Sequence, residues 1–139
     1  PWEAASRLFP TAVYRYLRGE AVVLAGPQVA RDFTWVGDVV DAYIAALHHT
    51  PWHGEVVNLA SGRQTTLQDF ADALLKVTHR RAKVRWDTAA GRAYDSATWV
   101  GSPDRAKQLL GWQAQTSLET GLRQMIEWMQ THAYAYANA

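Results

Sequence analysis

Residues 55–75 read EVVNLASGRQTTLQDFADALL and hold two hydrophobic patterns in succession. The first is a short β-forming run that ends at a Ser-Gly pair, which predicts a strand over residues 55–60 buried on both faces. The second has apolar residues at helical spacing, which predicts an amphipathic helix over residues 66–78. A strand followed directly by a helix is typical of an α/β fold.

Short side chains that can cap helices stand ahead of several apolar runs. Side-chain oxygens at such positions accept hydrogen bonds from the first free backbone N–H groups of a helix, which stabilises its start. Two of these starts also carry an acid or amide three residues later, as a capping box requires. The predicted caps are Thr65 or Thr66, with Gln68 completing a capping box with Thr65, then Ser102 ahead of Pro103, and Thr116 with Glu119.

The rest of the chain alternates short β-forming runs with amphipathic helical patterns. Between Asp87 and Gly101 no period is visible, which marks a long and often functional loop. The sequence therefore predicts an α/β protein of mixed helices and short strands. The further predicted helices cover residues 10–19, 38–49, 103–110 and 117–131, and the further predicted strands cover 21–25, 32–36 and 83–87.

Composition and charge restrict the class of protein. The chain has 139 residues, which suits one domain with a single core, and its 48% hydrophobic and 19% charged residues are those of a globular protein. No apolar run approaches the ~20 residues of a membrane span, and a net charge of +1 is too small for a nucleic-acid-binding surface. The absence of Cys and of an apolar N-terminal signal favours the cytoplasm. We therefore predict a cytoplasmic protein with neither a membrane nor a nucleic acid as partner.

Motifs for catalysis, cofactor binding and metal binding are missing. Phosphate-cradling loops need closely spaced glycines, and none of the nine glycines has another near enough. None of the tyrosines is followed four residues later by the Lys of a dehydrogenase Tyr-Lys pair. His48, His49 and His53 could suggest a metal site, but Pro51 breaks any helix that would align them. We predict no catalytic, cofactor-binding or metal-binding residue in this chain.

Three stretches in this order and spacing resemble the C-terminal portion of the NAD-dependent epimerase/dehydratase family, the extended short-chain dehydrogenases that act on nucleotide sugars. The resemblance covers nearly all of residues 1–131. Each motif alone is moderately specific, and the resemblance to the family rests on finding all of them in this order and spacing. The motifs are RDFTWVGDVV at 31–40, EVVNLASG at 55–62 and SPDRAKQLLGW at 102–112, with Arg92-Ala93-Tyr94-Asp95 between the last two.

The resemblance implies a two-part parent enzyme with a Rossmann-type fold. Its N-terminal half would bind NAD(P) and carry the catalytic Tyr and Lys, and the parent would be a homodimer. By this resemblance residues 1–131 form the substrate-binding C-terminal domain, 132–139 form a tail, and the Rossmann half is absent from this chain. Pro1 is similar to the proline of a Tyr-Gly-Pro turn that leads into this domain, and 55–60 to a strand of the main parallel sheet. We therefore expect the segment alone to be inactive.

Five residues are predicted to bind the nucleotide-diphospho sugar, by their match to family positions. Arg31 opens the Arg-Asp-Phe motif, and together with Arg92 it would clamp the diphosphate. Two guanidinium forks suit two phosphates, because each can bind phosphate oxygens in bidentate fashion. Asp95 would accept a hydrogen bond from a hydroxyl of the ribose or of a neighbouring group. Leu8 and Phe9 fall where the family's nucleobase pocket begins, although core packing explains them equally well.

Two alternatives remain open from the sequence. Arg31 can instead serve as an ion-pair partner of Asp32 or Asp38. The whole chain can instead be a binding or assembly module that kept the fold without the chemistry, or one half of a split enzyme completed by a separate Rossmann chain. The nucleotide, the sugar and the choice among epimerisation, dehydration, reduction and decarboxylation are likewise open.

Overall fold

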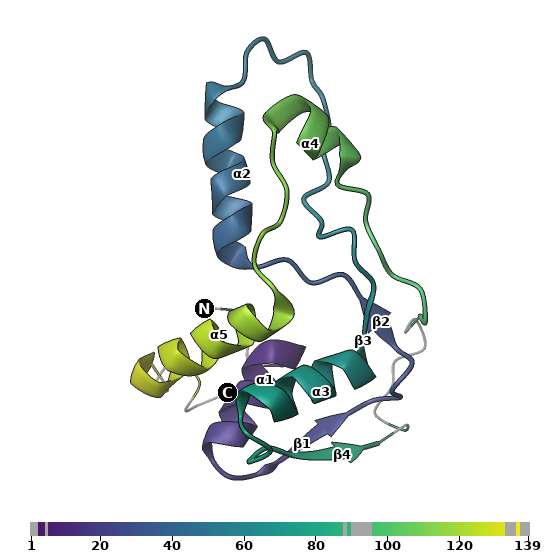
Figure 1. Ribbon diagram of the computed structural model, residues 1–139, viewed down its shortest axis with the longest axis vertical. Coiled ribbons are helices and arrows are strands. Elements are labelled where there is room, and N and C mark those ends of the chain that lie inside the picture. Colours follow the sequence, from purple (N-terminus) through teal and green to yellow (C-terminus); the bar gives the residue numbers. More distant parts are fainter. Residues whose placement is uncertain (1–2, 5, 88, 90–95, 133–135, 137–139) are drawn as a thin grey trace.

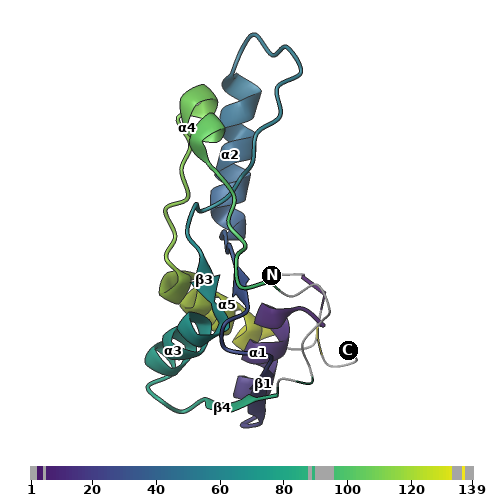
Figure 2. The same cartoon turned by 90° about the vertical axis from the view of Figure 1, so that its right-hand side faces the viewer.

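The computed structural model describes residues 3–4, 6–87, 89, 96–132 and 136. The chain is elongated, with α1, α3, α5 and a strand pair at one end and α2 with α4 at the other (Figures 1 and 2). In chain order the elements are α1 (Leu8–Leu17), β1 (Ala21–Leu24), β2 (Ala30–Arg31), α2 (Val36–His48), β3 (Thr65–Thr66), α3 (Leu67–Val77), β4 (Lys83–Trp86), α4 (Asp104–Leu110) and α5 (Leu118–His132).

The main core lies between the three helices α1, α3 and α5 and the strand pair β1–β4. The two strands run parallel, with Ala21 opposite Lys83 and Leu24 opposite Trp86, and both had been predicted from the sequence. The helices bury the apolar faces that their periodicity predicts, because a helix of this length is stable in water only when it packs such a face. The largest fully buried side chains are Phe70, Leu74, Leu122, Met129, Val13, Val22 and Pro10.

The strand predicted over 32–36 is wrong. The strand β2 ends at Arg31, where it pairs antiparallel with β3, and α2 begins at Val36. The β-forming residues between them pack into the core instead: the Phe33 ring lies 5.0 Å from that of Phe9 and 6.3 Å from that of Phe70. Aromatic residues favour strands because they pack on half-buried surfaces, and here the surface is a helical one.

The strand predicted over 55–60 is also wrong, as is its burial. These residues form no strand, and Val56 is 75% exposed. A strand requires a neighbouring chain segment that accepts and donates its hydrogen bonds, and no such segment pairs with these residues in the described part of the chain. Val57 and Leu59 nevertheless pack against a small second cluster built around Trp112.

The helical extension consists of α2 and α4, which lie side by side in both views (Figures 1 and 2). The side chain of Asp38 lies on α2 and is only 7% exposed. Its carboxylate accepts hydrogen bonds from the backbone N–H groups of Gln115 (3.2 Å) and Thr116 (2.9 Å) and from the Thr116 hydroxyl (2.9 Å). The indole Nε1 of Trp112 donates to the Asp38 carbonyl at 2.6 Å. These bonds hold the α4–α5 connection against α2.

The five predicted helices are confirmed, each within two residues at its start and end, but several caps differ. Thr66, one of the two predicted caps, is the N-cap of α3, and its partner in the capping box is Asp69 rather than Gln68. Thr116 does not cap α5, because its hydroxyl donates to a carboxylate on α2; Ser117 accepts the Thr120 N–H at 3.1 Å instead. The N-cap of α4 is Pro103 rather than Ser102. None of the helices in the described residues is both long and apolar enough to cross a membrane.

Candidate functional site

A cavity of about 370 Å³ lies beside the start of α1, β1 and the segment around β2. Leu8, Phe9 and Arg31, three of the residues predicted to bind substrate, line it together. Their side chains come from two segments that are far apart in the sequence, so the fold brings them to one place. The other two predicted residues, Arg92 and Asp95, lie outside the described residues.

Leu8 and Phe9 form the first turn of α1 and supply an apolar wall. The Phe9 ring meets the Phe33 ring edge to face, at 5.0 Å between centroids, and the Phe70 ring at 5.1 Å. Edge-to-face contacts of this kind hold the rings in defined orientations. Phe9 therefore belongs to both the core and the cavity, so the structure combines the two interpretations that the sequence left open for it.

Arg31 is one of two arginines that line this cavity, the other being Arg7, and the acids Glu3 and Asp32 line it as well. The Arg31 side chain is half-buried, and its Nη1 donates to the Ala30 carbonyl at 2.6 Å. The guanidinium carbon lies 5.2 Å from the centre of the Trp99 ring, within the range of a cation–π interaction. The sequence analysis missed Trp99, since the only available signal was one aromatic residue in a long stretch without periodicity.

The alternative role for Arg31, an ion pair with Asp32 or Asp38, is wrong. Both carboxylates bind backbone N–H groups instead. Within the described residues the ion pairs join Arg18 to Glu20 and Lys76 to Glu119, and Arg31 is not in ion-pair contact with either acid.

A second cavity, of about 430 Å³, adjoins the first and shares Phe9, Asp32 and Phe33 with it. Its other walls come from the start of α2 and from α5, including Trp35 and Met125. The aromatic wall around Phe9 therefore borders both cavities.

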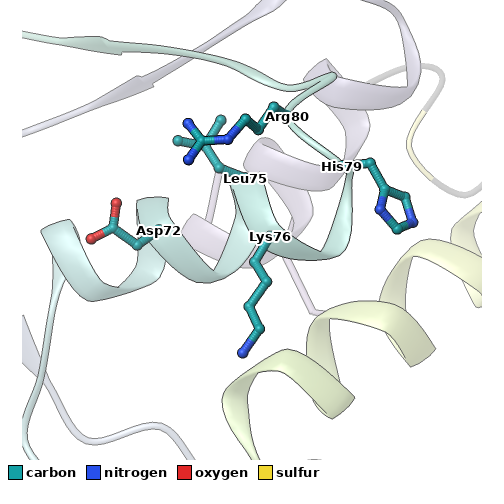
Figure 3. A pocket seen from close by; sticks show the side chains of 5 residues that line it. All are labelled: Asp72, Leu75, Lys76, His79 and Arg80. Carbon is teal, nitrogen blue, oxygen red and sulfur yellow. The ribbon is translucent and has the colours of Figure 1, made fainter.

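Another cavity, of about 590 Å³, lies at the C-terminal end of α3 (Figure 3). Lys76 extends toward α5, where it meets Glu119 at 3.2 Å, while Arg80 and His79 point in other directions. The pKa of Glu119 is lowered by a hydrogen bond from its own backbone N–H and by Lys76. Because these charged side chains point in different directions, they do not converge on one position where an anion could bind.

No group of three or more His, Cys, Asp or Glu side chains in the described part of the chain is placed to hold a metal ion. Two of the three histidines considered above have other contacts: the His49 ring packs against Trp52 at 4.6 Å, and the backbone N–H of His53 donates to Glu55 at 2.6 Å. That hydrogen bond lowers the pKa of Glu55.

The α/β arrangement around this cavity is that of the extended short-chain dehydrogenases. The crystal structure of UDP-glucose 4-epimerase from Thermotoga maritima with UDP-glucose superposes with a TM-score of 0.81 at 28% identity, over 94% of this chain and 41% of that one. The Bordetella bronchiseptica enzyme WbmF, in complex with NAD+ and UDP, superposes with a TM-score of 0.74 at 32% identity, over 94% of this chain and 38% of that one. The predicted fold class is thereby confirmed.

The sequence comparisons agree with the structural ones. The family model for GDP-mannose 4,6 dehydratase matches residues 2–125. UDP-glucose 4-epimerase from Rhizobium meliloti (strain 1021) is 38% identical over 90 residues, which are 63% of this chain and 27% of that protein. The chain belongs to the NAD-dependent epimerase/dehydratase family, as its motifs predicted. It spans 27% to 37% of the length of the first curated relatives it matches.

Proposed function

We propose that this chain binds a nucleoside-diphosphate sugar in the cavity lined by Leu8, Phe9 and Arg31, as the substrate-binding part of an NAD(P)-dependent epimerase or dehydratase. The observation that carries the proposal is the meeting of these three residues at one cavity. NAD(P) supplies hydride-transfer chemistry in such an enzyme, and the glycine spacing of this chain does not fit that cofactor. We therefore place NAD(P), and the catalytic Tyr and Lys, on a part of the parent that this chain lacks.

The cavity has the chemistry that a nucleoside diphosphate requires. Leu8 and Phe9 offer apolar surface to a base or sugar ring, and the Arg31 guanidinium offers paired N–H donors to phosphate oxygens. We propose Arg92 as the second phosphate-binding arginine and Asp95 as the acceptor of a ligand hydroxyl. One contact supports this placement: the carbonyl of Ser96, which follows Asp95 in the sequence, accepts the Ala30 N–H at 2.8 Å.

The exposed apolar face of α2 supports a second part of the proposal, docking of the parent's Rossmann half. Exposed apolar patches of this kind mark protein contacts, and Leu47 is 80% exposed. Residues 55–60 follow this helix without strand partners and would complete the parallel sheet of that half. The large apolar side chains exposed on α2 and in the segment that follows it, up to residue 60, are Val36, Val40, Tyr43, Ile44, Leu47, Trp52 and Val56.

Titration of UDP, GDP and TDP into the chain, followed by calorimetry, tests the binding proposal. Arg31→Ala is expected to weaken binding of the nucleotide that binds best by about 10- to 100-fold, because it removes charge-assisted hydrogen bonds. Arg31→Lys restores binding only in part, since an ammonium lacks the planar fork. Arg18→Ala is the matched control, because Arg18 forms an exposed ion pair with Glu20.

The same calorimetry separates the proposal from its competitors. NAD+ and NADP+ are expected to give no binding heat with this chain. The proposal is wrong if none of the three nucleotides binds the wild type, or if Arg31→Ala lowers the melting temperature and leaves nucleotide binding intact.

A further inference from the structure

The carboxylate of Asp32 accepts four hydrogen bonds. One oxygen, Oδ1, accepts the backbone N–H of Ser61 at 2.9 Å and its hydroxyl at 2.5 Å. The other oxygen, Oδ2, accepts the backbone N–H groups of Gly62 and Gly101, both at 3.1 Å. Both oxygens therefore face backbone donors, and these donors come from two segments that are distant from Asp32 in the sequence.

These segments cross between the two ends of the molecule. Asp32 lies between β2 and α2, Ser61 and Gly62 lie ahead of β3, and Gly101 lies ahead of α4. The three connections run from the helical extension toward the main core (Figures 1 and 2). The crossing is tight, because a Cβ atom on Gly101 would lie 2.6 Å from the Cβ of Ala60.

The segment that Asp32 binds through Gly101 also carries Trp99. At one end of this segment the Ser96 carbonyl accepts, at 2.8 Å, the N–H of the residue before Arg31. At the other end the Gly101 N–H donates to Asp32. Trp99 lies between these two attachments, and its ring is 5.2 Å from the guanidinium carbon of Arg31. The attachment at Asp32 thus determines where the Trp99 ring meets Arg31.

We propose that Asp32 is a positioning residue of the nucleotide-sugar site, which acts by fixing the Trp99 segment against the Arg31 guanidinium. This inference rests on the function proposed above for the Arg31 cavity. Asp32 lines the cavity as well, but a carboxylate accepts hydrogen bonds only and repels a phosphate. Its contribution to anion binding is therefore indirect, through the geometry of Arg31.

This argument gives Asp32→Ala a defined sign. Alanine has no hydrogen-bond acceptor in its side chain, so the variant loses all four hydrogen bonds to Ser61, Gly62 and Gly101. Asparagine is unsuitable, because its oxygen can still accept the Gly62 and Gly101 N–H groups. If Asp32 acted only through its charge, the loss of a negative charge beside an anion site would strengthen nucleotide binding. Positioning predicts the opposite.

Two measurements on the full chain test the inference. The first is calorimetric titration with the nucleotide among UDP, GDP and TDP that binds the wild type. The second is the ring-current shift that the Trp99 indole imposes on the side-chain protons of Arg31 in NMR spectra, which needs no ligand. Asp32→Ala is expected to weaken nucleotide binding about tenfold, which corresponds to about 1.4 kcal/mol, and to abolish the Arg31 shift. Asp72→Ala, at an exposed carboxylate of α3, is the control with the same charge change (Figure 3).

The outcomes separate the inference from the proposed function. If the wild type binds none of the nucleotides, the proposed function fails, and the Arg31 shift then decides only whether Asp32 fixes the Trp99 segment against Arg31. Unchanged or tighter nucleotide binding by Asp32→Ala, or an Arg31 shift equal to that of the wild type, overturns the inference. If Asp32→Ala does not fold, Ser61→Ala removes one of the four bonds and is expected to give smaller changes in the same two directions. The absence of both changes in that variant overturns the inference too.

Discussion

Asp38→Ala and Asp38→Asn are expected to differ sharply in their effect on stability. The Asp38 carboxylate holds the α4–α5 connection through the N–H groups of Gln115 and Thr116 and through the Thr116 hydroxyl. Alanine removes the acceptor for all three donors. Asparagine keeps one oxygen, which can accept both N–H groups, and its NH2 can donate to the Thr116 hydroxyl, because a hydroxyl both donates and accepts.

The magnitude follows from the donors left without a partner. An unsatisfied buried donor costs about 1–3 kcal/mol, and Asp38→Ala leaves two N–H groups unpaired. Because both hydrogen bonds are only partly buried, water compensates for some of this cost, and we expect a loss of about 2–4 kcal/mol in the free energy of unfolding. Asp38→Asn loses only the favourable charge in the first turn of α2, which costs about 0.3–1 kcal/mol.

Urea denaturation at neutral pH measures both values. Asp41→Ala is the matched control, because Asp41 is an exposed carboxylate on the same helix. Equal losses for the alanine and asparagine variants would refute the reasoning, since the charge rather than the hydrogen bonds would then stabilise the connection. A loss below about 1 kcal/mol for Asp38→Ala would refute it as well.

Two further outcomes are expected. Gly101→Ala places a Cβ 2.6 Å from that of Ala60 and should lower the free energy of unfolding by about 1–3 kcal/mol, whereas Gly26→Ala, whose new Cβ meets only Val29 at 4.0 Å, should leave urea denaturation unchanged. Asp69→Ala removes the capping box of α3 and should cost about 0.5–2 kcal/mol at neutral pH. Hydrogen bonds from Thr66 lower the pKa of Asp69, so this stabilisation is complete above the carboxyl's usual pKa and is lost as pH falls through the lowered one. A cost that stayed constant down to acid pH would contradict that origin.

The helices show how much of the fold local sequence patterns can predict. All five were predicted to within two residues at their starts and ends, because the periodicity, the caps and the terminating glycines lie within a few turns of the residues they affect. The cap of α5 shows the limit of prediction from local patterns, because Ser117 rather than the predicted Thr116 accepts a backbone N–H of the first turn. A hydroxyl can cap its own helix or bind a carboxylate on another, and only the arrangement of the helices decides which.

The candidate site was predicted in part. Arg31, Leu8 and Phe9 were chosen by their match to family motifs, and the fold brings them to one cavity. The geometry that surrounds Arg31 could not be read from the sequence. Arg31 contacts Trp99, and the segment that carries Trp99 is bonded to Asp32 through Gly101, 69 positions away from Asp32 in the sequence.

The amino-acid sequence by itself determined the helices, the α/β class and the family, because each depends on patterns or motifs within short stretches. The tertiary structure decided the strands and the surroundings of the site. Residues 32–36 and 55–60 have β-forming composition, yet neither pairs as a strand, since pairing requires a partner from elsewhere in the chain. The same physical reason applies to Asp32 and Asp38, whose carboxylates bind donors that only the folded chain brings within hydrogen-bond distance.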